Sequence, residues 1–325
     1  MTKMFLRTIL TFMTTQQIYN LAIKMGIDSD LRGKAKVAKV LQRNKEKYSK
    51  LDKDKKKEFD LESLKNPYSD TRILHEANKG QIKKILMGID IGPGEMMLAD
   101  KLGCNLVISH HPLGKALADL SDVMHLQAQV LARYGVPINI AEGVLRERIE
   151  EVSRGVAPIN HNRVVDIAKL LKINLISVHT PCDNLAADFL FKFIKRKKPE
   201  LVLDIIRDLK KIPEYSAAVK LKSGPRVFAG SSENSVGKIA ITEITGGTEG
   251  AKTIYSKMAQ AGLGTVIGMH LGEEHRKEAQ KAHMNVVIAG HMSSDSLGIN
   301  LFLDKLEKKK IKIIPCSGVI RIKRK

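Results

Sequence analysis

Short runs of β-branched and other apolar residues alternate with longer amphipathic stretches from Lys83 to the end of the chain. This alternation is typical of βαβ units, in which helices connect parallel strands and cover the sheet. The pattern therefore predicts an α/β protein with mixed, mostly parallel sheets. The runs expected to form strands are residues 85–91, 105–109, 138–141, 173–178, 238–244, 264–268, 285–289, 311–315 and 319–322.

The pattern of apolar and charged residues changes at two further places in the sequence. Residues 14–65 keep apolar residues at helical spacing in a charged background, and Asn66–Asp70 then interrupts this pattern. A second change lies between Lys195 and Lys238, where a basic run is followed by Gly- and Ser-rich turns. We therefore expect a helical N-terminal segment (1–80), a first α/β lobe (81–198), a connector (199–236) and a second α/β lobe (237–325).

Composition and cysteine usage limit the class of protein. The 325 residues are 43% hydrophobic and 28% charged, which is typical of a globular protein that folds without disulfides. Cys104, Cys182 and Cys316 lie far apart and form no CxxC pair, which favours the cytoplasm and argues against a Cys-type zinc site. No apolar run reaches the roughly 18 to 20 residues of a membrane helix, so no membrane association is expected.

The net charge of the chain bears on its partners. Lys and Arg number 55 against 35 Asp and Glu, which gives +20 and favours anionic substrates. Lys residues are scattered through every segment and only 4% of residues are aromatic, a pattern more typical of a solvated surface than of a nucleic-acid interface. An anionic small molecule is the expected ligand, and nucleic acid is an alternative that the sequence does not favour.

Three of the expected strands end at histidines, and two of these histidines are followed four residues later by an aspartate. Because ligands of parallel α/β sheets gather outside the carboxyl ends of the strands, these strand ends are expected to form one shared site. One such histidine alone would be interpreted as a partly buried side chain bonded to the backbone, but the recurrence favours a site. The residues are His110, His111, His179, Asp183, His291 and Asp295.

The residue types at these strand ends indicate which cofactor they bind. Imidazole and carboxylate together suit Zn, Fe, Mn or Ni, whereas Mg and Ca prefer oxygen ligands alone. Neighbouring residues of a strand point to opposite faces, so His110 and His111 more naturally serve two ions than one. Asp183 could then bridge the ions, and the i, i+4 spacing of His291 and Asp295 places both on one helix face. The expected cofactor is a pair of divalent metal ions.

These motifs resemble those of the Nif-three-like dinuclear metal proteins, often labelled "GTP cyclohydrolase I type 2". The resemblance covers about residues 82–195 and 238–325, so the N-terminal segment lies outside it. The motifs that carry it, in family order, are His110-His111-Pro112, His179-Thr180-x-x-Asp183 and Gly290-His291-x-x-Ser294-Asp295.

The resemblance implies a fold, an assembly and a site. The fold would be two α/β lobes with a dinuclear metal site in the cleft between them, and the assembly a ring-shaped homo-oligomer, usually a hexamer. His179 would line the site. The family usually has Glu at the position of Asp295, and the shorter side chain could still ligate while weakening or repositioning the second ion. The implied metal ligands are His110, His111, Asp183, His291 and Asp295.

Two further features are candidates for binding. The run Gly246–Thr253 follows an expected strand and opens a helix, but Ala251 stands where a phosphate loop requires Gly. We therefore expect a glycine-rich turn whose amides could still hold an anion. His270 closes another expected strand and His275 follows it, and both positions suit substrate contacts.

Two functions of different classes follow from this site. The first is a metal-dependent hydrolase that acts on a nucleotide or phosphorylated small molecule through a metal-bridging hydroxide, with His179 as proton shuttle. The family label implies opening of the GTP purine ring, but metal ligation does not by itself select a reaction. The second is a non-catalytic metal-binding or regulatory protein that stores, senses or delivers metal.

Overall fold

The N-terminal region is largely helical, as the sequence predicts. The computed structural model describes residues 13–324, so the first twelve residues of the expected N-terminal segment lie outside it. The first helix begins at a capping box, in which the side chains of Thr14 and Gln17 each accept a hydrogen bond from the other residue's backbone N–H. The elements are α1 (Thr15–Asp28), α2 (Lys34–Lys50), α3 (Lys53–Glu58), the 3-10 turn η1 (Leu61–Leu64) and β1 (Arg72–His75).

The first sheet has five strands in the order β1-β4-β3-β2-β9. β1 is antiparallel to β4, and all other neighbours are parallel. Ser109 of β3 pairs with Gly88 of β2 on one side and Ser177 of β4 on the other, so three carboxyl ends lie at one edge of the sheet. The further strands are β2 (Lys84–Gly88), β3 (Leu106–Ser109), β4 (Asn174–Ser177) and β9 (Lys312–Cys316).

The second sheet has four strands in the order β5-β8-β7-β6, with β5 antiparallel to β8 and the rest parallel. Its strands are β5 (Arg226–Ala229), β6 (Lys238–Ile241), β7 (Leu263–Gly268) and β8 (Asn285–Ile288). Two mixed, mostly parallel sheets together with a helical N-terminal region confirm the expected fold class.

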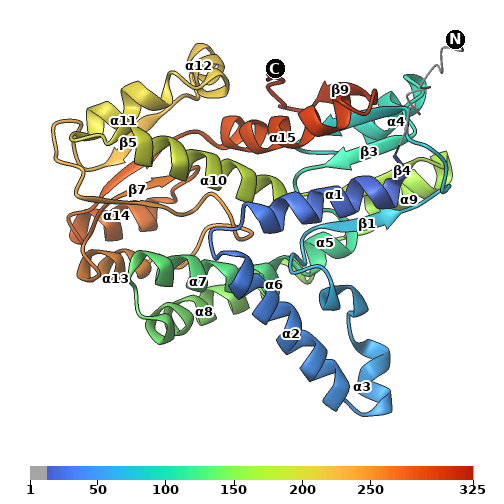
Figure 1. Cartoon of the computed structure of the whole chain (residues 1–325), viewed down its shortest axis with the longest axis horizontal. Coiled ribbons are helices and arrows are strands. Elements are labelled where there is room, and N and C mark those ends of the chain that lie inside the picture. Colours follow the sequence, from blue (N-terminus) through green and yellow to red (C-terminus); the bar gives the residue numbers. More distant parts are fainter. Residues whose placement is uncertain (1–12, 325) are drawn as a thin grey trace, which may run out of the picture.

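Helices connect most of the strands and pack around both sheets (Figure 1). None of the helices between residues 13 and 324 is long and apolar enough to cross a membrane. The helices of the first part are α4 (Pro93–Lys101), α5 (Gly114–Ala118), α6 (Leu120–Val123), α7 (His125–Tyr134), α8 (Ile138–Val156) and α9 (Arg163–Leu171). Those of the second part are α10 (Thr180–Lys197), α11 (Val202–Leu209), α12 (Pro213–Lys220), α13 (Ile254–Gln260), α14 (Glu273–Lys281) and α15 (His291–Glu307).

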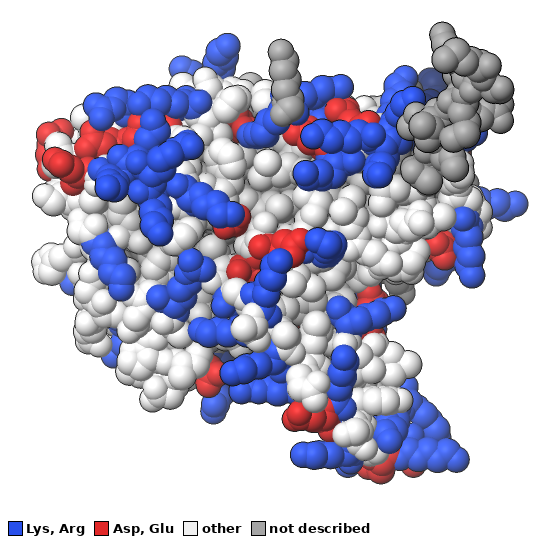
Figure 2. Space-filling model, in the orientation of Figure 1, with Lys and Arg blue, Asp and Glu red and all other residues white. Residues whose placement is uncertain are grey.

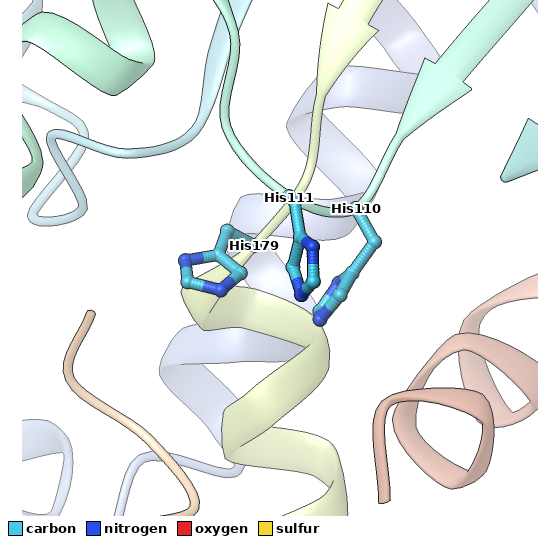
Figure 3. A group of neighbouring side chains, drawn as sticks. All are labelled: His110, His111 and His179. Carbon is cyan, nitrogen blue, oxygen red and sulfur yellow. The ribbon is translucent and has the colours of Figure 1, made fainter. Parts of the chain in front are cut away.

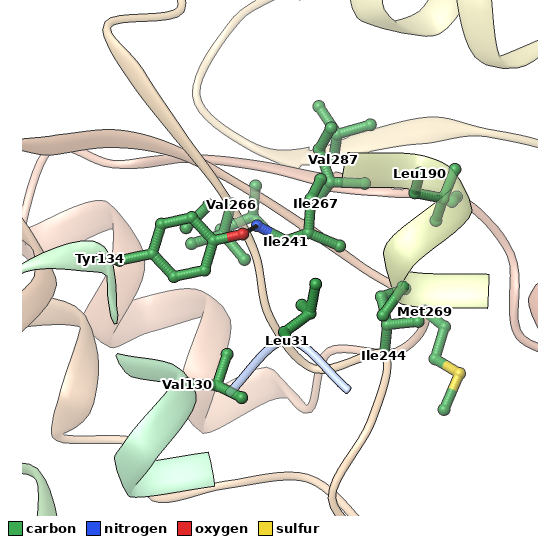
Figure 4. Packing of buried hydrophobic residues seen from close by; sticks show 14 of the residues in the cluster. Leu31, Val130, Tyr134, Leu190, Ile241, Ile244, Val266, Ile267, Met269 and Val287 are labelled. Carbon is green, nitrogen blue, oxygen red and sulfur yellow. Dashed lines mark hydrogen bonds between the residues drawn. The ribbon is translucent and has the colours of Figure 1, made fainter. Parts of the chain in front are cut away.

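The largest buried cluster includes residues of the N-terminal region, of α7 and of the second sheet. Figure 4 shows Leu31, from the turn after α1, near Val130 of α7 and Ile244. In the same cluster the backbone N–H of Ile241 donates to the hydroxyl of Tyr134 over 3.0 Å. The N-terminal region therefore contributes side chains to the core and is not an appendage.

Two of the expected strands are not strands. Residues 138–141 begin α8, because their apolar pattern continues at helical spacing through the buried Leu145 and Val152. Residues 319–322 form no strand, and Arg321 there is held by ion pairs of 2.6 and 2.9 Å to two acidic residues of α15. β1, in contrast, is a strand that the sequence analysis does not expect.

The domain boundaries expected at residues 198 and 237 stay a prediction, but the strands do not divide in chain order. β9, near the C-terminus, pairs in parallel with β2 of the first sheet, with Lys312 opposite Lys84. β5, within the expected connector, joins the second sheet beside β8. Both ends of the sequence therefore contribute strands to the first sheet.

Helices α10 and α15 pack closely and connect the two sheets. α10 follows β4 of the first sheet, and α15 follows β8 of the second. Their approach requires Gly298, because a Cβ atom at this position would lie 2.0 Å from the carbonyl oxygen of Cys182. Asp183 follows Cys182 directly, and Asp295 lies about one turn before Gly298. The same contact therefore holds the two aspartates close together.

We expect Gly298→Ala to destabilise the protein by about 1 to 3 kcal/mol, because the added methyl group forces the two helices apart. The free energy of unfolding, measured by urea denaturation, checks this. Gly143→Ala is the matched control, since Gly143 is an exposed residue of α8 whose Cβ would meet nothing within 4 Å. This control should be neutral or stabilising by about 0.5 to 1 kcal/mol. Equal effects of the two substitutions would contradict the close-packing argument.

Candidate metal centre

The six residues that the sequence analysis places at strand ends lie together in the structure. They come from the loop after β3 and from the N-terminal ends of α10 and α15. Figure 3 shows the rings of His110, His111 and His179 turned toward the same space. The full cluster is His110, His111, His179, Asp183, His291 and Asp295.

The nitrogen and oxygen atoms of the cluster face one another at 3.3 to 3.7 Å. Nε2 of His110 lies 3.3 Å from Oδ1 of Asp183 and 3.5 Å from Oδ1 of Asp295. Oδ2 of Asp295 lies 3.6 Å from Nε2 of His111 and 3.7 Å from Nε2 of His291. These distances exceed those of good N–H···O hydrogen bonds, about 2.7 to 3.2 Å, so the atoms surround a common space.

Three of the rings are fixed by a hydrogen bond at the nitrogen that points away from this space. Nδ1 of His110 bonds a backbone carbonyl oxygen at 3.1 Å. Nδ1 of His111 bonds Asp90 at 2.7 Å, and Nδ1 of His179 bonds Asp70 at 2.8 Å. Because a carbonyl or a carboxylate can only accept, each Nδ1 donates its N–H, and in the neutral ring each Nε2 is left with a lone pair. This is the tautomer that a metal ligand needs.

The inward-facing atoms lack hydrogen-bond partners within residues 13–324. Nε2 of His110 and all four carboxylate oxygens of Asp183 and Asp295 are buried without one. Both aspartates are only 1% exposed. Buried carboxylates are strongly unfavourable unless a positive charge compensates them. Imidazole nitrogen and carboxylate oxygen are also ligands of Zn, Fe and Mn, so the residues present fit divalent metal ions.

The pKa shifts within the cluster also favour a bound positive charge. Burial alone would raise the pKa of the Asp295 carboxyl, but the three neighbouring histidine rings lower that pKa to well below its usual range. Burial disfavours a charged His110 ring, yet Asp295 and Asp183 raise the pKa of His110 well above its usual value. The cluster therefore attracts positive charge, which a bound metal ion would supply in place of a proton.

The potential ligands form three overlapping groups whose ligand atoms lie within 4.8 Å of one another. Asp295 belongs to two of the groups and Asp183 to one, so Asp295 is the carboxylate that the geometry shares between groups. The bridging role that the sequence analysis considers for Asp183 stays a prediction. The groups, which are compatible with metal binding, are His110-His111-His179, His111-His291-Asp295 and His110-Asp183-Asp295.

Comparison with protein families agrees with this fold. The model of the family described as "Duf34/NIF3 (NGG1p interacting factor 3)" matches residues 155–318, about half of the chain. The chain belongs to this family. The match includes α10 and α15 with their aspartates, whereas His110 and His111 precede it. A comparison with curated proteins finds no match.

Solved structures support the NIF3 fold. The crystal structure of a NIF3 superfamily protein from Sphaerobacter thermophilus is 23% identical, with a TM-score of 0.76 over 94% of this chain and 99% of that one. Reduced HcgD from Methanocaldococcus jannaschii is 16% identical, with a TM-score of 0.52 over 81% and 94% of the two chains. At these identities the likeness establishes the fold alone.

Sequence reasoning missed two residues of this NIF3-family site, Asp70 and Asp90. Asp90 follows β2 at the edge where β3 and β4 end, but the strand expected over 85–91 ran through it. Asp70 is fully buried in the N-terminal region, where its Oδ2 accepts from His179 and from the Thr180 hydroxyl at 2.6 Å. No local pattern marks Asp70, because its role depends on a fold contact with α10.

The two further histidines have different surroundings. The His270 ring lies 5.3 Å, centroid to centroid, from that of His291, and burial together with the charge of His291 lowers the pKa of His270 to about 4. His270 therefore borders the metal cluster as a neutral ring. His275 lies elsewhere, with its Nε2 bonded to the carbonyl oxygen of Gly250 at 2.9 Å.

One amide of the glycine-rich turn, and one amide next to the turn, bond carboxylates of the chain. The N–H of Gly250 donates to Glu243 over 3.0 Å, and the N–H of Gly272 nearby donates to Glu249 over 2.6 Å. Carboxylates of the chain thus occupy places that an anion would take in a phosphate loop. The turn is a structural element, as the missing glycine at Ala251 predicts.

We expect Asp90→Ala to weaken zinc binding by about 10- to 100-fold, because the His111 ring loses the bond that orients it. A competition titration against a chromophoric chelator measures this. Asp100→Ala, which removes an exposed aspartate of α4, is the control and should leave affinity unchanged. Unchanged affinity in Asp90→Ala would contradict the orienting role.

Proposed function

We propose that the cluster holds two divalent metal ions and catalyses hydrolysis of an anionic small molecule, a nucleotide or another phosphorylated metabolite. The observation that carries the proposal is the set of five buried ligand atoms without partners in the described chain. Two such ions lower the pKa of a coordinated water and stabilise the negative charge that develops on a substrate oxygen. The net charge of +20 favours the approach of an anion.

In this proposal His179 carries a proton. Its Nδ1–H is bonded to Asp70, so Nε2 accepts and returns the proton, and this atom lies 3.7 Å from Oδ2 of Asp183. Burial opposes a charged ring, but Asp183 and Asp70 raise the pKa of His179 above its usual value, which stabilises the ring after it has accepted a proton. The residues that hold the ions are His110, His111, Asp183, His291 and Asp295.

Substrate would approach from the side of His111 and His291. Their side chains are 28% and 37% exposed, whereas those of the other four cluster residues are at most 5% exposed. The four buried residues have almost no access to solvent, so a substrate can reach the cluster only past the rings of His111 and His291. His270, beside His291, is placed to contact a substrate on this side.

A second candidate function is storage, sensing or delivery of metal without turnover. The burial of the cluster favours this function, because both aspartates are almost inaccessible to solvent and therefore to a substrate. Such a protein would bind and release metal reversibly and would hydrolyse nothing.

Assembly and location stay predictions. The resemblance implies a ring-shaped homohexamer, which native mass spectrometry of the purified chain would detect. A cytoplasmic location remains the expectation from cysteine usage, and fluorescent fusion imaging would test it.

To test the hydrolase, protein reconstituted with Zn, Mn or Fe is screened against nucleoside triphosphates, phosphomonoesters and phosphodiesters. On a substrate found this way, His179→Gln should lower kcat by about 10²- to 10⁴-fold while metal content stays unchanged. His161→Gln is the matched control, because His161 lies outside the cluster and bonds only the backbone of α8. It should retain both metal and activity.

Elemental analysis of Asp295→Ala completes the test. Loss of metal from this variant is expected, because two of the three ligand groups lose a member. Metal content equal to that of the unmodified protein would refute the ligand assignment. Full metal occupancy without turnover of any substrate class would favour storage or delivery.

A further inference from the structure

Five basic residues form a stripe along one face of α2. Their spacing of three, four, four and three residues returns each side chain to the same face of a helix with 3.6 residues per turn. All five are exposed, and the stripe spans about 21 Å at 1.5 Å per residue. The residues of this α2 stripe are Lys36, Lys39, Arg43, Lys47 and Lys50.

The charges of the α2 stripe are not neutralised by the protein. None of its members forms an ion pair with an acidic group in the part of the chain that the structure describes. Three basic residues on other faces of this region do form ion pairs: Lys34 with Asp28 at 2.6 Å, Lys55 with Asp52 at 3.1 Å and Lys57 with Asp54 at 2.8 Å. The stripe therefore presents five positive charges in a row, each without an ion-pair partner in the described residues.

The stripe lies on an arm that projects from the body of the protein. Figure 1 shows α2 and α3 extending away from the two sheets, and Figure 2 shows basic side chains crowding the arm. Residues 34–58 contain eleven Lys and Arg against four Asp and Glu. The stripe also borders a concave surface of about 430 Å³ between α2 and the start of α8, which Lys36, Lys39 and Arg43 line together with Ile138 and Glu142.

The chemistry of the arm selects among polyanions. A helix that lies on a membrane needs a wide exposed apolar face, but residues 34–58 expose no large hydrophobic side chain and Val37 is buried. A single-stranded nucleic acid needs free aromatic rings for stacking, but Tyr48 packs on Phe59 at 5.1 Å and lies under Lys56. A straight row of cations without either feature matches the regular phosphate backbone of a duplex.

We propose that the α2 stripe binds double-stranded nucleic acid through its phosphates, without reading the base sequence. This binding is independent of the metal centre, because no member of the cluster lies on the arm. Five phosphate contacts give a slope of log affinity against log salt of about −4.5, which is a loss of about 500-fold between about 50 and 200 mM salt.

The test measures binding of the whole protein to a fluorescent DNA duplex of mixed sequence by anisotropy, at several NaCl concentrations. The stripe variant carries Lys39→Gln, Arg43→Gln and Lys47→Gln. The matched control carries Lys45→Gln, Lys53→Gln and Lys57→Gln, which remove the same charge from exposed positions of the arm outside the stripe. Thermal unfolding confirms that both variants are folded.

The expected result is a slope of about −2 for the stripe variant, because two contacts remain, and an unchanged slope for the control. Removal of metal by a chelator should leave duplex binding unchanged. Equal losses in the two variants would overturn the proposal, because general charge and not the stripe would then account for binding. Binding to vesicles of anionic lipid without binding to the duplex, or a stripe variant that changes only the oligomeric mass, would also overturn it.

Discussion

The candidate metal centre depends on the contact between α10 and α15. Each helix leaves a different sheet, and the contact at Gly298 brings Asp183 and Asp295 within reach of the same imidazole, that of His110. Two buried carboxylates repel each other and lose their hydration, so nothing in the cluster favours this approach in the absence of positive charge. The apolar packing of the two helices supplies the stabilisation, and a bound cation would remove the electrostatic penalty.

Much of this site could be predicted from the sequence, because one rule of parallel sheets applies to it. The strands before His110 and His179 end in register, at Ser109 opposite Ser177, so residues that follow them meet without further information. The hydrogen bonds that orient these rings, in contrast, correspond to no local pattern in the sequence. Asp70 reaches His179 only after the N-terminal region has packed on α10, and pairing of this kind is set by tertiary contacts.

The errors in the fold have similar causes. The run 138–141 is short, apolar and follows a proline, and such a run does not distinguish a strand from the first turn of a helix until its continuation is considered. The sequence also does not predict that β9 joins the first sheet, because the periodicity of apolar residues identifies a strand but not the strand with which it pairs. The alignment of five basic residues on one face of α2 likewise becomes visible only when helix geometry is applied to lysines that are scattered in the sequence.

The pairing of β9 with β2 has a consequence for biosynthesis. Lys84 and Lys312 are partners although most of the chain separates them, so the first sheet stays open at β2 until β9 has been synthesised. During that interval β2, whose last four residues are buried in the finished protein, is an unprotected edge that can pair with other chains. α15, which precedes β9 in the chain, carries His291 and Asp295, so the last two candidate ligands are synthesised shortly before the strand that closes this edge.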